Sequence, residues 1–343
     1  SYYDDNENST YEWSDWLSFG KWGTHIKRSS KSPDSHLAKI STDEFIIKGS
    51  YTDTASKIQI RALLHTENTN VTPSIRQFII SYKDNTPRLK SIEIPSNKII
   101  DVPSYSQYIR DKNIGGVICS PTSITMLLNR RNENLIVEET AWSCFDYDYE
   151  AFGNWLFNVA FASSLGYESF VEYGNLKSLK REIYSEYPVA VSVKYTNDIN
   201  NLEYPYIENA PITTAGNILV VRGFEKKDGI DYVVVNDPAG KSNESVTRRY
   251  KLSEFESAWH RGSNIMYIIH DKEVEINNNR IEASLELKNN KENLYSVLVN
   301  DTYLDLSSDF VKTILITYDN GLTFEYLVPY NNHYLALENK NKC

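Results

Sequence analysis

The spacing of apolar residues between positions 99 and 270 changes several times, from the period of a helix to the unbroken run of a buried strand. Apolar side chains at Ile124, Leu127 and Leu128 predict a helix that starts at or just after Cys119. Further helices are expected over 153–166, 175–187 and 252–260, and strands over 188–194 and 264–270. This alternation predicts a domain that mixes helices with a sheet over residues 96–270.

Two apolar runs, 217–225 and 230–237, are joined by a short charged turn that contains Asp228 and Gly229, which is a hairpin signal. In an antiparallel hairpin the start of the first strand lies beside the end of the second. Asn217 and Asp237 are therefore predicted to lie nearly abreast at one end of the sheet. Polar groups placed there, beside the helix start at Cys119, form a candidate site.

The flanking segments show short strand-like runs separated by Asp, Asn, Ser and Gly. The runs at 45–49, 57–64 and 76–82 predict a β-sandwich-like domain over residues 1–95, and residues 83–96 are expected to be a linker. Runs at 294–301, 312–319 and 333–338 predict a small β appendage over 271–343. The chain is thus divided into three domains, 1–95, 96–270 and 271–343.

The net charge of -10 and the isoelectric point near 5.2 argue against a nucleic acid or an anionic membrane as the main partner, because both are polyanions. No apolar run approaches the roughly 20 residues that a transmembrane helix needs, so no membrane span is expected. The three cysteines, Cys119, Cys144 and Cys343, fit neither a disulfide framework nor a zinc spacing. No metal and no other cofactor is predicted.

Cys119 has the sequence context of a nucleophile. Ser120 and Thr122 are residues that cap helices, and Pro121 suits a first turn. Free N–H groups and the positive end of the helix dipole would then favour the thiolate, which is the nucleophilic form of cysteine. The alternative is a buried cysteine that acts only as a small hydrophobic residue.

Six separated motifs in this region resemble the bacterial peptidase C39-like family, whose fold is that of the papain-like cysteine peptidases. They are VPSYSQY, ICSPTSITMLL, GNWLFN, GNILVVRGF, YVVVNDPAG and RRYKLSEFESAW, in the order of the family. The resemblance implies an α+β fold, with a cysteine at a helix N-terminus and an antiparallel sheet. It also implies that Cys119 is the nucleophile, Asp237 the orienting acid and Gln107 a side chain of the oxyanion hole.

The chain departs from the family at the catalytic base, because Asn217 stands where the family has its histidine. An asparagine side chain can donate a hydrogen bond but carries no proton that titrates near neutral pH. Without a cation beside it, the Cys119 thiol is expected to keep a pKa near or above about 8.5. His260 and His270 follow the hairpin and do not begin a strand beside Asp237, so neither is expected to replace the base.

Three functional interpretations remain open for this domain. The first is a cysteine peptidase or amidase impaired by Asn217, either natural or introduced to trap a complex. The second is an amide-forming acyltransferase or thioesterase that takes an activated thioester, because a thiolate leaves without needing an acid. The third is a catalytically inactive domain that binds a peptide. The partner is thus a peptide, an amide or a thioester, and no oligomeric state is predicted.

The cellular compartment depends on which interpretation holds. The family resemblance favours an exported protein, whereas a domain that uses a thioester would be expected in the cytoplasm.

Overall fold

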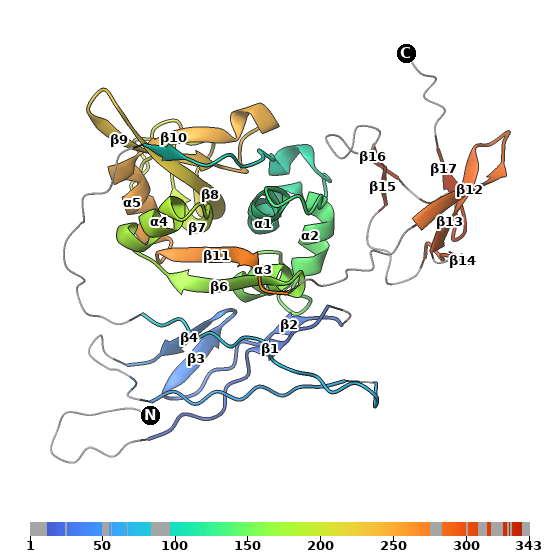
Figure 1. Ribbon diagram of the computed structural model, residues 1–343, viewed down its shortest axis with the longest axis horizontal. Helices are drawn as coiled ribbons and strands as arrows, with labels where there is room; N and C mark the ends of the chain where they lie inside the picture. The colour runs from blue at the N-terminus through green and yellow to red at the C-terminus, as the bar shows by residue number, and fades with distance from the viewer. Residues whose placement is uncertain are drawn as a thin grey trace.

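The computed structural model of the 343-residue chain describes a continuous central part and shorter flanking segments (Figure 1). The described residues are 12–24, 26–49, 55, 57–66, 68–83, 97–274, 283–299, 301–307, 314–316, 325–327, 329 and 331–337. Among them, none of the helices combines the length and the apolar character needed to cross a membrane.

One seven-stranded antiparallel sheet organises the central part. Its strands run in the order β10-β9-β8-β7-β11-β6, and β5 pairs with β8. Their bounds are β5 Lys98–Ile99, β6 Tyr167–Tyr173, β7 Val189–Tyr195, β8 Thr214–Lys227, β9 Ile230–Asn236, β10 Thr247–Lys251 and β11 Ile265–Lys272. The predicted hairpin is confirmed as the pair β8 and β9, with Asp228 and Gly229 in the left-handed conformation that a tight turn requires.

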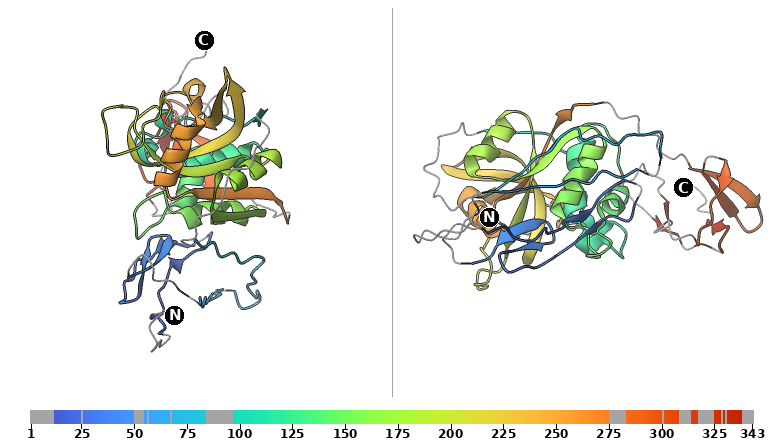
Figure 2. Two further views of the ribbon diagram at one scale, coloured as in Figure 1. Left: turned by 90° about the vertical axis from the view of Figure 1, so that its left-hand side faces the viewer. Right: turned by 90° about the horizontal axis from the view of Figure 1, so that it is seen from below.

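Five α-helices surround this sheet. They are α1 Cys119–Asn129, α2 Val137–Cys144, α3 Trp155–Ser164, α4 Leu176–Tyr184 and α5 Leu252–Arg261. Helix α1 packs on β7 and β8, and α5 packs on β7, β9 and β10. The two helices cover opposite faces of the sheet (Figure 2). The helices predicted from apolar spacing are therefore confirmed, and the domain is α+β as expected.

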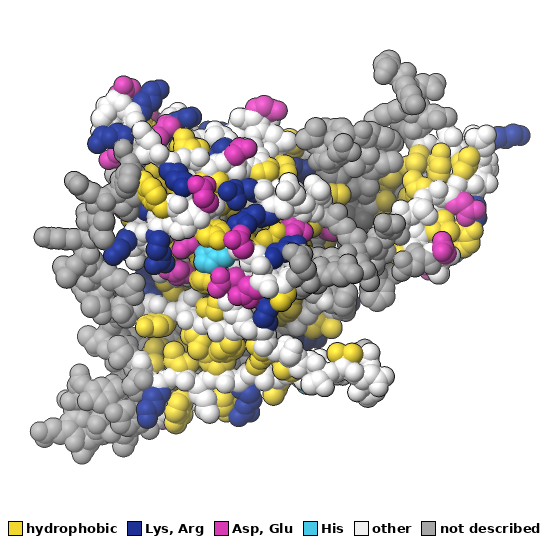
Figure 3. All heavy atoms as spheres, viewed as in Figure 1, with side chains coloured by type: hydrophobic (Ala, Val, Ile, Leu, Met, Phe, Trp, Pro, Cys, Tyr) yellow, Lys and Arg dark blue, Asp and Glu magenta, His cyan; other side chains and the backbone are white. Residues whose placement is uncertain are grey.

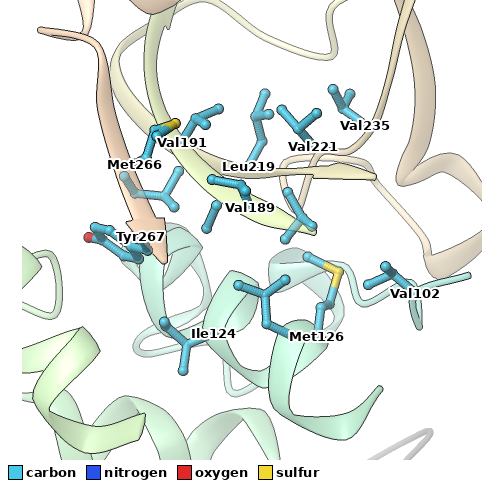
Figure 4. Close-up of a cluster of buried hydrophobic side chains, with 14 of the residues drawn as sticks. Val102, Ile124, Met126, Val189, Val191, Leu219, Val221, Val235, Met266 and Tyr267 are labelled. Carbon is cyan, nitrogen blue, oxygen red and sulfur yellow. The ribbon is translucent and has the colours of Figure 1, made fainter. Parts of the chain in front are cut away.

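The core lies between α1 and the central strands. Ile124 and Met126 of α1 belong to the same buried cluster as Val191 of β7 and Leu219 and Val221 of β8. In Figure 4, the α1 side chains lie on one side of the strands, and Val191, Leu219 and Val221 lie on the other. Strands β7 and β8 are covered on both faces, which is why their apolar residues form continuous runs instead of alternating. This packing fixes the start of α1 against the end of β8, where the candidate site lies.

The strands predicted near the N-terminus are only partly present. Strands β1 Gly20–Lys21 and β2 Ser29–Ser30 pair with each other, as do β3 Ala38–Ser41 and β4 Glu44–Ile47, which confirms the run at 45–49. The prediction of strands at 57–64 and 76–82 is wrong, because the described residues there form no ladder. Leu63 and Phe78 are 73% and 56% exposed, so the alternating pattern has found no partner strand to pack against.

Apolar side chains are visible on the lower part of the face in Figure 3, where Figure 1 places the N-terminal strands. Among these strands, the β3–β4 hairpin contacts the central domain through Asp43, whose carboxylate accepts a 2.8 Å hydrogen bond from the backbone N–H of Trp155 at the start of α3. Burial raises the pKa of Asp43 to about 7.

Most of the predicted linker, residues 84–96, lies outside the described residues.

The C-terminal part contains the predicted β-strands. Strands β12 Ala283–Asn289, β13 Leu294–Val299, β14 Thr302–Tyr303 and β17 Leu335–Ala336 form one sheet. Strands β15 Leu315–Ile316 and β16 Glu325–Tyr326 pair with each other. Of the three predicted runs, each therefore contains a strand, although those at 312–319 and 333–338 are two residues long.

Candidate active site

Cys119 is the first residue of α1, as the sequence predicts. The predicted caps are wrong, because no side chain caps this helix. Ser120 shares a 2.9 Å hydrogen bond with the hydroxyl of Tyr267, and the Thr122 hydroxyl donates to the Ile118 carbonyl at 2.7 Å. Pro121 lies in the first turn as expected. The N–H groups at this helix start are therefore not occupied by side-chain caps.

The thiol of Cys119 has a raised pKa, in agreement with the expectation from the missing histidine. Loss of hydration is the largest cause, and the negative charge of Asp237 raises the pKa further. Backbone N–H groups of Ile218, Ser120 and Cys119 itself hydrogen-bond to the sulfur and act in the opposite direction. Cys119 as a whole residue is partly exposed. The helix start thus supplies donors but too little positive charge to hold a thiolate at neutral pH.

Asn217 and Asp237 lie together as the hairpin predicts. The side-chain N–H of Asn217 donates to Asp237 Oδ1 at 3.0 Å, and both residues are buried. The residue after Asn217 is Ile218, whose N–H contacts the Cys119 sulfur. Asn217 therefore lies beside Asp237 and is next in the chain to a residue whose backbone contacts the Cys119 sulfur.

Asp237 is fully buried and accepts four hydrogen bonds. Its Oδ1 accepts from Asn217 and from the backbone N–H of Ala239, at 3.0 Å each. Its Oδ2 accepts from the hydroxyls of Tyr195 at 2.7 Å and Tyr250 at 2.8 Å. A buried carboxylate needs such donors to offset its lost hydration. Asp237 thereby links the ends of β7, β8, β9 and β10.

Tyr195 and Tyr250 were not predicted as site residues, because nothing in the sequence sets them apart from the other 23 tyrosines. The pKa of each is raised well above its usual value, mainly by burial and then by the charge of Asp237. Tyr195 and Tyr250 therefore stay protonated and act as hydrogen-bond donors. The Tyr195 hydroxyl also accepts a 3.2 Å hydrogen bond from Asn217. The pairing of β10 with β9 places Tyr250 opposite Val233, from where its hydroxyl reaches Asp237.

Gln107 lies next to the Asp237 loop, on a short 3-10 helix over Gln107–Ile109. Its backbone N–H donates to the carbonyl of Pro238 at 2.9 Å. Its side chain is buried, and the Oε1 atom has no hydrogen-bond partner among the described residues. A buried polar atom without a partner is costly in a folded protein unless a ligand satisfies it. The role of Gln107 in an oxyanion hole stays a prediction.

Neither histidine of the central domain, residues 97–274, contacts this network. His260 pairs with Asn264 at 3.1 Å. The two ring nitrogens of His270 each lie 2.8 Å from a carboxylate, one of Glu168 and one of Glu182. These carboxylates raise the pKa of His270, the bond to Glu182 contributing most. The expectation that neither histidine replaces the base is in agreement with this arrangement.

The Glu168–His270–Glu182 contact predicts a pH-dependent stability. Because the native pKa of His270 is raised, its stabilisation is complete below the unfolded pKa of about 6.5 and is lost as the pH rises through the native pKa. Urea unfolding of wild-type protein and of His270→Gln between about pH 6 and pH 9 should show a difference that shrinks by on the order of 1 kcal/mol. A difference that is constant or grows with pH would contradict this. His260→Gln is the matched control, because His260 lacks a carboxylate partner.

Cys144 does not belong to the site. It is fully buried and forms no disulfide with a described residue, and burial raises its pKa. Cys343 lies outside the described residues. Among the residues that the structure does describe, no group of three or more His, Cys, Asp or Glu side chains has the arrangement of a metal site.

Comparison with solved structures returns chains of low sequence identity. A putative C39-like peptidase from Bacillus anthracis is 16% identical, with 52% of this chain and 100% of that chain covered and a TM-score of 0.39. A double glycine motif protease from an AMS/PCAT transporter, crystallised with the leader peptide, is 17% identical over 50% and 93% of the two chains, with a TM-score of 0.33. Procathepsin L 3 of the Tenebrio molitor larval midgut is 15% identical over 50% and 67%, with a TM-score of 0.34.

Comparison with curated proteins gives no match. The model of the Peptidase_C39 like family, in contrast, matches residues 99–266, which include all six motifs noted in the sequence and the whole Cys119, Asn217 and Asp237 arrangement. The resemblance predicted from those motifs is confirmed: residues 99–266 of this chain match the Peptidase_C39 like family.

Proposed function

We propose that the central domain binds a peptide at Cys119 and does not cleave it, so that a cysteine peptidase fold serves as a binding module. The observation that carries this proposal is the Asn217 side chain, which donates to Asp237 at 3.0 Å in the place of a catalytic base. The partly exposed Cys119 and the unpaired Oε1 of Gln107 support a bound ligand. The carboxylate of Asp237 already accepts four hydrogen bonds, which supports a structural role for the rest of the network.

The chemistry of peptide cleavage explains why the missing base matters. Attack by the thiolate on the carbonyl carbon forms a tetrahedral intermediate, from which either the thiolate or the amine can leave. The amine leaves only when an acid protonates its nitrogen, and the amide of Asn217 has no such proton to give. The raised pKa of Cys119 also keeps the thiolate fraction low at neutral pH. Both steps are therefore slow.

A second candidate is acyl transfer from a thioester, and the N–H groups of Cys119, Ser120 and Ile218 around the sulfur favour it. The Cys119 thiolate would attack the thioester carbonyl, and the carbon–sulfur bond to the donor would break to release the donor thiolate. No acid is needed, because the leaving thiolate is a weak base. Incubation with N-acetylcysteamine thioesters would then give a mass increase on wild-type protein that is absent from Cys119→Ser.

One experiment tests the proposed binding function directly. Cys119 alkylation by iodoacetamide is followed by intact mass between about pH 6 and pH 10, with Cys144 and Cys343 replaced by Ser. We expect an apparent pKa above the usual value of about 8.5, because burial and Asp237 both oppose ionisation. In parallel, a mixture of peptides derived from a protein digest should show no cleavage by wild-type protein beyond that by Cys119→Ser.

The outcome that contradicts the proposal is cleavage that depends on Cys119. Such a result, together with an apparent pKa well below 8.5, would show that another group supplies the base and that the domain is a working peptidase. Retention of peptides by immobilised wild-type protein, without cleavage, would support the binding function.

A further inference from the structure

Apolar side chains are unusually exposed on the segments that carry the candidate site. Among the large apolar residues of the central domain, the three with the highest exposure are Leu202 at 95%, Ile199 at 71% and Val117 at 61%. Val117 lies two residues before Cys119, and the other two belong to the loop between β7 and β8. Single exposed apolar residues are common, but each of these three lies within about seven residues of Cys119 or Tyr195 in the chain, which favours a contact surface beside the site. We name these three residues the apolar rim.

The loop that carries Leu202 and Ile199 leaves the sheet beside the site. Its first strand ends at Tyr195, which contacts Asp237, and its second strand begins at Thr214, which pairs with Tyr195. The base of the loop is closed by a 2.8 Å hydrogen bond between the hydroxyls of Thr196 and Thr213. The loop therefore emerges from the end of the sheet where Asn217 and Asp237 lie.

The tip of this loop is ordered by its own hydrogen bonds. The side chain of Asp198 accepts from the backbone N–H of Asn200 at 2.9 Å, and the Asn201 side chain accepts from the N–H of Glu203 at 2.9 Å. Such turns fix the backbone locally. Ile199 and Leu202 are thus held in solvent by a defined backbone, which lowers the entropic cost of binding a partner through them.

Two glycines near the site in the chain face open space. A Cβ atom added at Gly116, beside Val117, or at Gly216, beside Asn217, would meet no heavy atom within 4 Å. In contrast, one added at Gly115 would lie 2.7 Å from the carbonyl oxygen of Gln107. The chain is therefore closely packed under Gln107 but open at Gly116 and Gly216, where a ligand can approach the backbone.

The loop also has a defined charge. Residues 196–213 contain Asp198, Glu203 and Glu208 and have no lysine or arginine. Glu208 is paired with Lys251 at 2.5 Å, whereas Asp198 and Glu203 form no ion pair with any residue that the structure describes. Buried Asp237 adds a further negative charge at the site. A ligand with positive charge near its apolar residues is therefore favoured over a negative one.

We propose that the apolar rim and the acidic loop select the ligand of this domain, which is a linear peptide with large apolar side chains next to lysine or arginine. The apolar side chains cover Leu202, Ile199 and Val117, and the basic ones face Asp198 and Glu203. This inference rests on the proposed function, because it assigns the class of peptide that the Cys119 site binds. Phospholipid or a peptide of other composition are outcomes that the test separates.

The test measures binding of three fluorescein-labelled peptides by anisotropy. The first is Lys-Leu-Ala-Leu-Lys-Ala-Leu-Lys, the second has its leucines replaced by serine, and the third has its lysines replaced by glutamate. We expect the first to bind most tightly and each of the others at least about tenfold more weakly. The double variant Ile199→Ser, Leu202→Ser should weaken binding of the first peptide by about tenfold, since two apolar contacts are lost.

Ile230→Ser is the matched control, because Ile230 is an exposed apolar residue at the opposite end of the same hairpin. Its affinity should equal that of wild-type protein. All these side chains are exposed, so the variants should fold, which circular dichroism checks. Equal binding of the three peptides, or an unchanged affinity of the double variant, would overturn the inference. The inference would also be overturned if wild-type protein and the double variant both bind phosphatidylglycerol vesicles more tightly than the first peptide.

Gly116→Trp separates this inference from the proposed function, because it places a large side chain in the open space at Gly116, three residues before Cys119. If this variant abolishes peptide binding while the double rim variant does not, the Cys119 site binds peptides but the rim does not select them. If wild-type protein binds none of the peptides, both the proposed function and the inference fail.

Discussion

Replacing Asn217 by His is expected to raise the rate of peptide cleavage at least about 100-fold over wild-type protein. One imidazole nitrogen can donate to Asp237 Oδ1 as the Asn217 amide does at 3.0 Å, which leaves the other nitrogen for Cys119. The imidazolium would stabilise the thiolate and later protonate the leaving amine. The measurement is kcat/KM on a fluorogenic apolar and basic peptide, with alkylation as a second readout, because the apparent pKa of Cys119 should fall.

Two matched controls are expected to keep the fold. One retains an amide at position 217, and the other removes the thiol. Asn217→Gln retains an amide at the same position and should stay inactive, and Asn217→His combined with Cys119→Ser should lose the gained activity. If Asn217→His folds with wild-type stability and shows neither activity nor a lowered thiol pKa, the missing base is not what disables the site. The blockage would then lie in the oxyanion donors, which directs attention to Gln107.

Removing the carboxylate of Asp237 is expected to destabilise the domain by about 3–5 kcal/mol in Asp237→Ala. The hydroxyls of Tyr195 and Tyr250 would lose their shared acceptor in the core, and Asn217 and Ala239 would each lose one as well. Leaving buried donors unsatisfied costs more than an ordinary hydrogen bond contributes. Urea unfolding at pH 7 measures the change in the free energy of unfolding.

A graded series makes this prediction specific. Tyr250→Phe removes one 2.8 Å bond and keeps the ring, so it should cost only about 1–2 kcal/mol. Asp231→Ala is the control for a carboxylate on the same strand, because Asp231 is exposed and its nearest cation, on Lys226, is 3.9 Å away. Its effect should be within about 0.5 kcal/mol. Equal effects of Asp237→Ala and Asp231→Ala would contradict a structural role for Asp237.

Taken together, these two expectations distinguish the roles that the network can have. The family resemblance implies that Asp237 orients a histidine. In this structure Asp237 instead accepts hydrogen bonds from three side chains that do not titrate near neutral pH. Without a base to orient, what Asp237 does in the wild-type chain is join four strands at one end of the sheet. A gain of activity in Asn217→His would show that the same network still supports catalysis when a base is supplied.

The sequence by itself determined the local elements of the site. Apolar spacing placed a helix start at Cys119, and the two apolar runs around Asp228 and Gly229 placed Asn217 beside Asp237. These predictions succeeded because each depends on residues close in the chain or on a short turn. The six motifs then identified the family, and they predict that Asn217 stands in place of its histidine.

Only the tertiary structure decided how the buried carboxylate is satisfied. Tyr195 and Tyr250 lie 42 and 13 residues from Asp237, and Ser120 meets Tyr267 across 147 residues, so local pattern contains no information about these pairs. The runs at 57–64 and 76–82 failed for the same reason. An alternating pattern makes a strand possible, but a strand forms only where another backbone supplies its hydrogen-bond partners.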